Sequence, residues 1–171
     1  YDQLDRQIQE KTALNRLFKW EYDANSNITK RIDALNRVTS YLYDAFNRLT
    51  KTTYPDSKTV THEYDARGNR TKTIDPIGAS SYVFDAFDRM NQATNPYGHI
   101  IKYEYDNADN LKKLTYPDNK LVTYGYDNNN RMVSVTDWNS KTTNYTYNKN
   151  GTLATRVYPN TISTKYSYDG A

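Results

Sequence analysis

Few side chains in this sequence have the type and spacing that catalysis requires. His62 and His99 are its 2 histidines, and cysteine is absent. Nucleophilic catalysis needs a hydroxyl or thiol beside a base that a third group orients, and no segment suggests such a set. His62 stands where related segments carry tyrosine or tryptophan, which indicates a packing role. We therefore predict a protein that is not an enzyme, with no catalytic residue and no cofactor.

One segment resembles the opening of a calcium-binding loop. Asp23 to Asn27 place oxygen-bearing side chains at alternate positions, but Ile28 replaces the required glycine and Ala34 the bidentate glutamate. Repeated turns built on Asp and Asn explain the segment better. The absence of cysteine excludes disulfide scaffolds and thiolate metal sites. We predict no metal site.

Charge and hydropathy exclude further classes. The 23 basic and 20 acidic residues give a net charge of +3 that is spread along the chain, which does not favour nucleic-acid binding. No segment is long and apolar enough for a membrane span or a signal peptide. A mean hydropathy of -1.01 would by itself suggest disorder, so an ordered fold must depend on where the apolar residues stand.

The apolar residues stand in a tandem repeat. A Tyr-Asp pair or a close variant recurs every 21 residues, with one step of 20 between Asp65 and Asp85. The aromatic residues of the pairs form a first column: Tyr1, Tyr22, Tyr43, Tyr64, Phe84, Tyr105, Tyr126, Tyr147 and Tyr168. A second column lies two residues earlier: Trp20, Tyr41, Tyr82, Tyr103, Tyr124, Tyr145 and Tyr166. Such a period is typical of arrays whose units bury apolar surface against their neighbours, so we predict one array of about eight units over residues 1–171.

The pattern within each unit predicts two strands and two turns. Aromatic residues two apart share one face of a strand, and the residues between them are mostly polar, as Lys19 and Glu21 are. The first turn follows the aspartate, as in Asp44 to Asn47. The second comes about ten residues later and often contains proline, as in Tyr54 to Ser57. We predict an all-β fold of tandem antiparallel hairpins, with about sixteen strands of roughly six to eight residues.

The register across the first turn has two solutions. Apolar residues stand five positions after the aspartate, as Leu49 does, and Arg or Asn stands four positions after it, as Arg48 does. If Leu49 shares the face of Tyr43, the hairpin needs a bulge. If Arg48 does so, it lies opposite Tyr43 and a cation–π contact can form. We favour the apolar match.

A sheet of this width is not expected to stay flat. Strand twist accumulates at roughly 20° per neighbour, and open sheets beyond about ten strands curl, split or close. We therefore expect a curved or spiralling sheet. Its two edge strands would expose unpaired backbone groups, which predicts edge-to-edge self-association.

The signatures Y-D-A-x-x-R-L from Tyr43 and Y-D-x-x-G-N from Tyr64, with a proline turn midway, resemble the YD repeats of Rhs-type proteins. The resemblance covers the whole chain. The positions that carry it, to which we assign a structural role, are Tyr22, Asp23, Tyr43, Asp44, Arg48, Tyr64, Asp65, Gly68, Phe84, Asp85, Arg89, Tyr105, Asp106, Tyr126, Asp127, Arg131, Tyr147, Tyr168 and Asp169.

The resemblance implies a function as well as a fold. In bacterial Rhs proteins, wall-associated polymorphic toxins and the B and C components of insecticidal toxin complexes, such repeats form a hollow β-shell around a variable C-terminal toxin domain. In teneurins a similar shell serves cell adhesion. The 171 residues supply only part of a shell and show no cargo domain, so we expect a fragment of a larger one.

The segment Asp75 to Ala79 approaches the self-cleaving D-P-x-G-L element of bacterial family members. It lacks the leucine and lies in phase with the other midway turns, so we interpret it as a turn.

Two functions follow as hypotheses. The first is a non-catalytic structural segment of a secreted or surface-exposed bacterial shell, whose partners are further YD repeats of the same parent chain and an enclosed C-terminal domain. The alternative is cell-surface adhesion or carbohydrate binding, in which exposed tyrosines stack on glycans. Covered aromatic columns favour the first hypothesis, and exposed ones favour the second.

Overall fold

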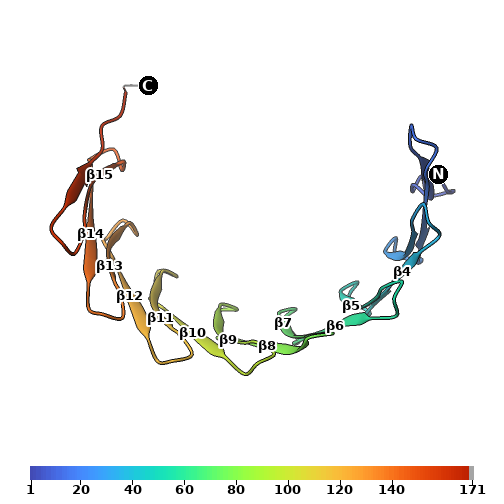
Figure 1. The fold of residues 1–171 in the computed structure, drawn as a ribbon, viewed down its shortest axis with the longest axis horizontal. Helices are drawn as coiled ribbons and strands as arrows, with labels where there is room; N and C mark the ends of the chain where they lie inside the picture. The colour runs from blue at the N-terminus through green and yellow to red at the C-terminus, as the bar shows by residue number, and fades with distance from the viewer. Residues whose placement is uncertain (170–171) are drawn as a thin grey trace. The chain divides into compact units, whose positions relative to one another are not determined.

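The computed structural model describes residues 1–169, which consist of strands and turns. Gly170 and Ala171, the last two residues of the predicted array, lie outside the described residues. The strands are β1 (Gln9–Lys11), β2 (Leu17–Tyr22), β3 (Ile28–Ile32), β4 (Val38–Tyr43), β5 (Leu49–Thr53), β6 (Thr59–Tyr64), β7 (Arg70–Asp75), β8 (Gly78–Phe84), β9 (Met90–Thr94), β10 (Ile100–Tyr105), β11 (Leu111–Thr115), β12 (Leu121–Tyr126), β13 (Met132–Thr136), β14 (Thr142–Tyr147), β15 (Leu153–Val157) and β16 (Ser163–Lys165) (Figure 1).

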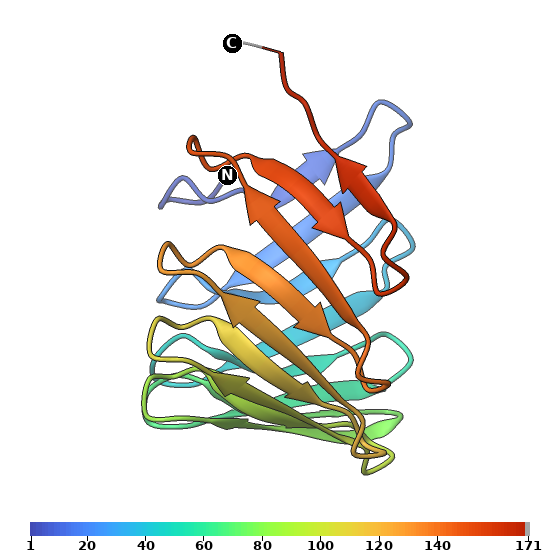
Figure 2. The same ribbon diagram turned by 90° about the vertical axis from the view of Figure 1, so that its left-hand side faces the viewer.

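The chain forms two compact units, residues 1–88 with 95–97, and residues 89–94 with 98–171. In the first unit each strand from β1 to β8 pairs antiparallel with the next one along the chain. Strands β9 to β16 of the second unit follow the same rule. Each sheet taken by itself is curved (Figures 1 and 2). The predicted all-β fold of tandem antiparallel hairpins is therefore confirmed. None of the described residues belongs to a helix that could cross a membrane.

The period of 21 residues follows from the lengths of the elements. One repeat consists of β4 with six residues, a turn of five, β5 with five and a second turn of five. Strands β2 to β15 have five to seven residues, and β1 and β16 have three. Eight strands have six or seven residues, as expected, and the remaining strands are shorter: these eight are β2, β4, β6, β7, β8, β10, β12 and β14.

A β-bulge follows each Tyr-Asp turn and fixes the register. Tyr43 pairs with Leu49, but the preceding residue Leu42 pairs with Lys51, so Thr50 is the extra residue. The same shift recurs in the other hairpins for which a register is given across this turn. Leu49 therefore shares the face of Tyr43, and the favoured apolar match is confirmed.

Burial is shallow because the described strands of each unit form one sheet without a second covering layer. Val122, which is 7% exposed, and Thr52, which is 6% exposed, are the most deeply buried residues among residues 1–169, and none of these residues has a fully buried side chain. The column aromatics are half-buried from Tyr22 to Tyr147 in the first column and throughout the second. Neighbouring side chains on the same face cover them, as cross-strand contacts do in any sheet.

The single 20-residue step has a local cause. Asp75 pairs directly with Gly78, so only Pro76 and Ile77 lie in the loop between β7 and β8. The carboxylate of Asp75 accepts hydrogen bonds from the backbone nitrogens of Ile77 (2.7 Å) and Gly78 (3.1 Å). The segment that resembles a self-cleaving element is thus the loop of a tight hairpin.

Gly78→Ala is expected to destabilise this hairpin. The φ of Gly78 is +147°, and a Cβ there would lie 2.9 Å from the Cβ of Pro96. Backbone strain and steric overlap act together, so we expect the free energy of unfolding to fall by about 2–3 kcal/mol. Gly98→Ala is the matched control, because Gly98 has a φ of +79° and no atom within 4 Å of an added Cβ. Strain alone is expected to cost about 1 kcal/mol there. Urea unfolding followed by circular dichroism compares the two, and equal losses would contradict the overlap.

Candidate functional site

Each Tyr-Asp turn is held by its aspartate. In the Asp44 turn, the backbone nitrogen of Asp44 donates to the carbonyl of Arg48 and the nitrogen of Asn47 donates back to the carbonyl of Asp44, both at 3.0 Å. Oδ1 of Asp44 accepts from the nitrogens of Phe46 (2.9 Å) and Arg48 (3.0 Å), and Oδ2 accepts from Nε of Arg48 (2.7 Å). Asn47 has a φ of +60°, which asparagine tolerates better than most residues.

Most of the predicted signature aspartates make equivalent bonds. Both carboxylate oxygens accept hydrogen bonds within the turn at Asp23, Asp65, Asp106 and Asp127. Asp85 accepts from the nitrogen of Phe87 at 2.9 Å. In the Asp65 turn, Gly68 occupies the position that Asn47 occupies in the Asp44 turn, and its φ is +98°. Asp169 is exposed at the end of the described residues.

Hydrogen bonding keeps these carboxylates ionised. The pKa of Asp127 is lowered by the side-chain hydrogen bond from Arg131 and then by that residue's backbone nitrogen, against a smaller opposing effect of desolvation. At Asp44 desolvation is the largest single effect and raises the pKa, but the bonds from Arg48 and Phe46 together outweigh it and lower the pKa. The pKa values of Asp2, Asp23, Asp65 and Asp106 are also lowered. Such groups serve as permanent acceptors and are poorly suited to proton transfer near neutral pH.

The column tyrosines tie each hairpin to the previous one. The hydroxyl of Tyr64 donates to the carbonyl of Leu49, fifteen residues earlier, at 2.8 Å. The equivalent bonds, all 2.7–3.0 Å long, are made by Tyr22, Tyr43, Tyr105, Tyr126, Tyr147 and Tyr168. Phe84 stands in the same column without a hydroxyl. Tyr22 donates to Gln7, and the other acceptors are apolar residues such as Leu49, which itself pairs with Tyr43 across the preceding Tyr-Asp turn.

Arginine four positions after the aspartate extends to the next turn. The guanidinium of Arg48 lies 4.6 Å from the ring centroid of Tyr64, and its Nη1 donates to the carbonyl of Asp65 at 3.1 Å. Arg6, Arg89 and Arg131 lie at 4.7–4.8 Å from Tyr22, Tyr105 and Tyr147 in the same way. The less favoured register put Arg48 over Tyr43 of its own repeat, whereas the cation–π contact is made with the tyrosine of the next one.

Asparagine replaces arginine at Asn27, Asn69 and Asn110, in alternate repeats, and Thr152 takes this position in the last alternate repeat. Nδ2 of Asn69 donates to Oδ1 of Asp88 in the next turn at 2.8 Å, and Asn27 and Asn110 make the same kind of bond. Cross-strand ion pairs follow the same alternation, with Glu21–Lys30, Glu63–Lys72 and Glu104–Lys113 at 2.8–3.1 Å. The side-chain contacts thus repeat with a period of two repeats, about 42 residues. This longer period was not predicted, although the alternation of Arg and Asn in the sequence indicates it.

The two histidines, His62 and His99, lie in different environments. Nδ1 of His62 lies 3.1 Å from Oγ1 of Thr73 on the paired strand. Burial, and secondly the positive charge of Arg70, lower the pKa of His62. His99 lines a surface cavity with Tyr116. Among residues 1–169, no cluster of three or more His, Asp or Glu side chains could hold a metal ion.

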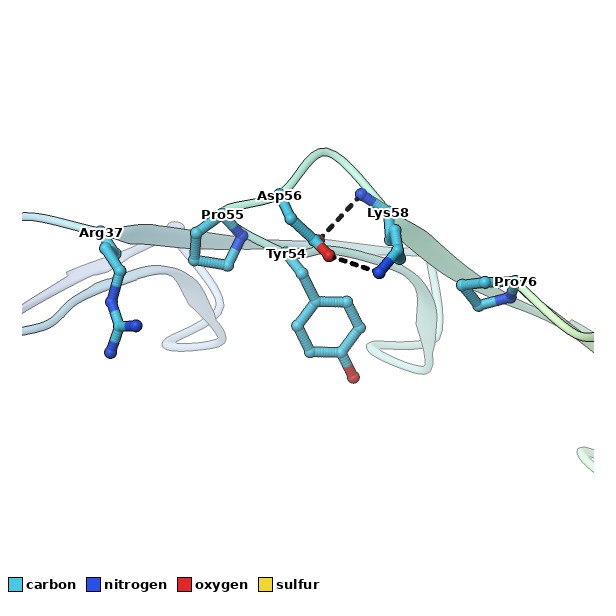
Figure 3. A pocket seen from close by; sticks show the side chains of 6 residues that line it. All are labelled: Arg37, Tyr54, Pro55, Asp56, Lys58 and Pro76. Atoms are coloured by element: carbon cyan, nitrogen blue, oxygen red, sulfur yellow. Dashed lines mark hydrogen bonds and ion pairs between the residues drawn. The ribbon is translucent and has the colours of Figure 1, made fainter.

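The proline-containing turns at the opposite ends of the strands form small surface cavities. One of about 640 Å³ is lined by Tyr54, Pro55, Asp56 and Lys58, with Arg37 and Pro76 from the adjacent turns (Figure 3). Asp56 accepts hydrogen bonds from the backbone nitrogen (3.2 Å) and the ammonium (2.9 Å) of Lys58. Tyr54 is 45% exposed, in contrast to the half-buried columns.

The repeats match a family model. The model described as RHS Repeat fits residues 22–59, 43–79, 64–100 and 105–143. The chain belongs to the RHS repeat family. A search of curated proteins finds no match to it. The predicted family is therefore confirmed, on the same Tyr-Asp repeats that build the turns described above.

Solved toxin-complex structures share the fold of this RHS repeat chain. A variant of the Photorhabdus luminescens Tc holotoxin pore aligns with a TM-score of 0.69 and 17% identity, over 88% of this chain and 9% of that chain. The TcdB2-TccC3-Cdc42 complex aligns with a TM-score of 0.70 and 17% identity, over 87% of this chain and 10% of that chain. TcdB2-TccC3 without its hypervariable C-terminal region aligns with a TM-score of 0.69 and 17% identity, over 87% of this chain and 10% of that chain. This chain thus spans about a tenth of those chains.

Arg48→Ala is expected to destabilise the protein. It removes a cation–π contact and a charged hydrogen bond to the next turn, so the free energy of unfolding should fall by about 1–3 kcal/mol. Arg37→Ala is the control. Arg37 bonds its own turn aspartate, Asp33, in the same way but has a side chain that is 61% exposed, and we expect a change within about 0.5 kcal/mol. Urea unfolding measures both, and similar losses would show that the inter-turn contact contributes little.

Acid is expected to destabilise the turns. The folded-state pKa values of the turn aspartates lie below 3.8, the ordinary value for aspartate, so their contribution to stability is complete above that pH and is lost as the pH falls through the folded values. Chemical unfolding between pH 7 and pH 2 should give a stability that declines mainly below about pH 4. Asp127→Asn should flatten that decline.

His62 adds a separate effect at higher pH. Because the pKa of His62 is lowered in the folded state, its contribution to stability is complete above 6.5, the ordinary pKa of histidine, and falls as the pH decreases below that value. His62→Tyr, which restores the column residue, should remove this component and leave the decline below pH 4 unchanged. A decline centred near pH 6 that persists in His62→Tyr would contradict the assignment.

Proposed function

We propose that this chain is a non-catalytic wall segment of a secreted bacterial Rhs-type shell that encloses or presents a C-terminal effector domain. The observation that carries the proposal is the continuous lateral linkage of hairpins by tyrosine, arginine and asparagine within each unit. A wall must resist separation of adjacent strands along its length, and these bonds oppose that motion. Membership of the RHS repeat family supports the same role.

The wall acts physically rather than chemically. Backbone hydrogen bonds between strands form its plane, and turns line its rims. A closed wall made of many such segments keeps an enclosed domain away from its targets and from proteases until release. The partners of this segment are then further repeats of the same parent chain, which pair with the edge strands, together with the enclosed domain. A copy of this chain lacking those neighbours should self-associate through the edges.

Half-burial of the aromatic columns favours the wall over an adhesive tyrosine ladder. The hydroxyls of the first column donate to backbone carbonyls, and the rings lie against neighbouring strands. A ligand that stacked on these rings would compete with those contacts. Adhesion at the cell surface would therefore need other aromatic residues, and the exposed ones outside the columns lie at the turns.

Limited proteolysis of the full-length parent protein tests enclosure. Intact-mass analysis should reveal a separate C-terminal fragment that resists protease in native buffer and is digested once denaturant opens the wall. A control digestion of the isolated C-terminal domain shows whether that domain resists protease by itself. A C-terminal region that is absent, or digested as fast inside the parent protein as alone, would overturn enclosure and favour surface adhesion.

A further inference from the structure

The turn between β14 and β15, residues 148–152, differs from the other Tyr-Asp turns in its first residue (Figure 1). Asn148 stands there, whereas the other repeats carry aspartate. In the Asp127 turn, one carboxylate oxygen accepts from the backbone nitrogens two and four residues later, at 2.9 and 3.0 Å. Among residues 1–169, the side chain of Asn148 bonds only the hydroxyl of Thr152, to which its Nδ2 donates at 2.9 Å. The β14–β15 turn therefore lacks the carboxylate that closes its counterpart.

The contact of this turn with the preceding one is also weak. Nη1 of Arg131 lies 3.5 Å from the carbonyl oxygen of Asn148, whereas the three equivalent arginine bonds are 2.9–3.1 Å long. The usual range for such a bond is about 2.7–3.2 Å. Two backbone bonds remain, from the nitrogen of Asn148 to the carbonyl of Thr152 and from the nitrogen of Gly151 to the carbonyl of Asn148. Because local opening occurs where restraints are fewest, we expect this turn to open more readily than the Asp127 turn.

The same turn contains the one Asn-Gly sequence of the chain, Asn150 and Gly151. The backbone nitrogen that follows an asparagine can attack the side-chain amide, and glycine has no Cβ to hinder that approach. Oδ1 of Asn150 accepts from the nitrogen (3.2 Å) and the hydroxyl (2.8 Å) of Thr152, and such donors stabilise negative charge that develops on the oxygen during attack. In the closed turn the nucleophile is occupied, because the nitrogen of Gly151 donates to Asn148 at 2.9 Å.

We propose that Asn150 is a site of spontaneous covalent modification that is controlled by opening of the β14–β15 turn. When the turn opens, the backbone nitrogen of Gly151 loses its proton to solvent and forms a bond to Cγ of Asn150. The bond between Cγ and Nδ2 breaks, and Nδ2 leaves as ammonia after taking a proton from water. The product is a cyclic succinimide. Water then adds to one of its two carbonyl carbons and breaks that carbon's bond to nitrogen, which gives aspartate or isoaspartate without oxidation or reduction.

The isoaspartate product changes the hairpin as well as the residue. Its main chain passes through Cγ, so the turn gains one backbone atom. Tyr147 pairs with Leu153 across this turn, and the register of a hairpin depends on the length of its turn. The modification is therefore expected to weaken the pairing of β14 with β15, whereas the aspartate product only adds a negative charge.

A matched site in the same unit tests whether the turn controls the reaction. Asn129 occupies in the Asp127 turn the position that Asn150 occupies in the β14–β15 turn. Asn130→Gly places the same dipeptide there, in a turn whose aspartate keeps its bonds to the nitrogens of Asn129 and Arg131. The folded 171-residue chain with this change is incubated at mildly alkaline pH, and mass spectrometry of its peptides measures the loss of each amide. Asn150 should react at least about fivefold faster than Asn129, since one such bond to a carboxylate already corresponds to that factor. In urea, which opens both turns, the two rates should rise and become similar.

Asn148→Asp is the converse variant. It supplies the missing carboxylate, so the modification of Asn150 should slow by at least about fivefold in the folded chain. The rate in urea should not change. Circular dichroism verifies that both variants are folded, and isoaspartyl methyltransferase labelling verifies the isoaspartate product.

The proposal is overturned if Asn150 in the folded chain reacts no faster than Asn129 in the Asn130→Gly variant. It is also overturned if Asn148→Asp leaves the rate at Asn150 unchanged, or if urea does not raise that rate, because the turn would then not control the reaction. None of these outcomes depends on whether the parent protein encloses an effector.

Discussion

Contact between neighbouring hairpins is the constraint on which the rest of the structure depends. Within each unit the sheet has no covering layer in the described residues, so it cannot rely on a deep core, and only Val122 and Thr52 are buried there. The column tyrosines partly bury the sheet face, which a second layer would otherwise cover. The ring of Tyr64, for example, covers the face of the adjacent strand, and its hydroxyl bonds a carbonyl fifteen residues earlier. One such bond contributes about 0.5–1.5 kcal/mol, and its repetition stabilises the array.

The turns make this lateral contact possible by fixing the register. An ionised aspartate that accepts two backbone N–H groups closes the turn in one geometry, and the bulge after it returns Leu49 to the face of Tyr43. A slip of one residue would move every aromatic side chain to the opposite face. The carboxylate therefore acts on the whole sheet although its bonds are local, which explains why aspartate recurs while the two residues that follow it vary.

The strands, the turns and the bulge were predictable from the sequence because each depends on residues within a single repeat. Strand faces, turn positions and the bulge follow from residues within one repeat, as Tyr43, Asp44 and Leu49 show. The partner of Arg48 was not predictable in this way, because Tyr64 belongs to the next repeat and its distance depends on the twist between hairpins. The Tyr116–Trp138 contact joins two turns for the same reason. The sequence also presents Trp138 out of phase with the aromatic columns, which concealed its relation to Tyr116.

The alternation of arginine and asparagine gives the wall a coarser unit than the repeat itself. Arg48 joins its turn to the next by a ring contact with Tyr64 and a bond to the carbonyl of Asp65. At the following joint Asn69 donates to Asp88, and Arg67 donates to the same carboxylate and to the carbonyl of Ala86. A guanidinium carries several N–H donors in a fixed fork, so one arginine can bond more than one oxygen of the neighbouring turn. These two joints therefore differ in which turn position supplies the guanidinium: it lies four residues after the aspartate at Arg48 and two residues after it at Arg67.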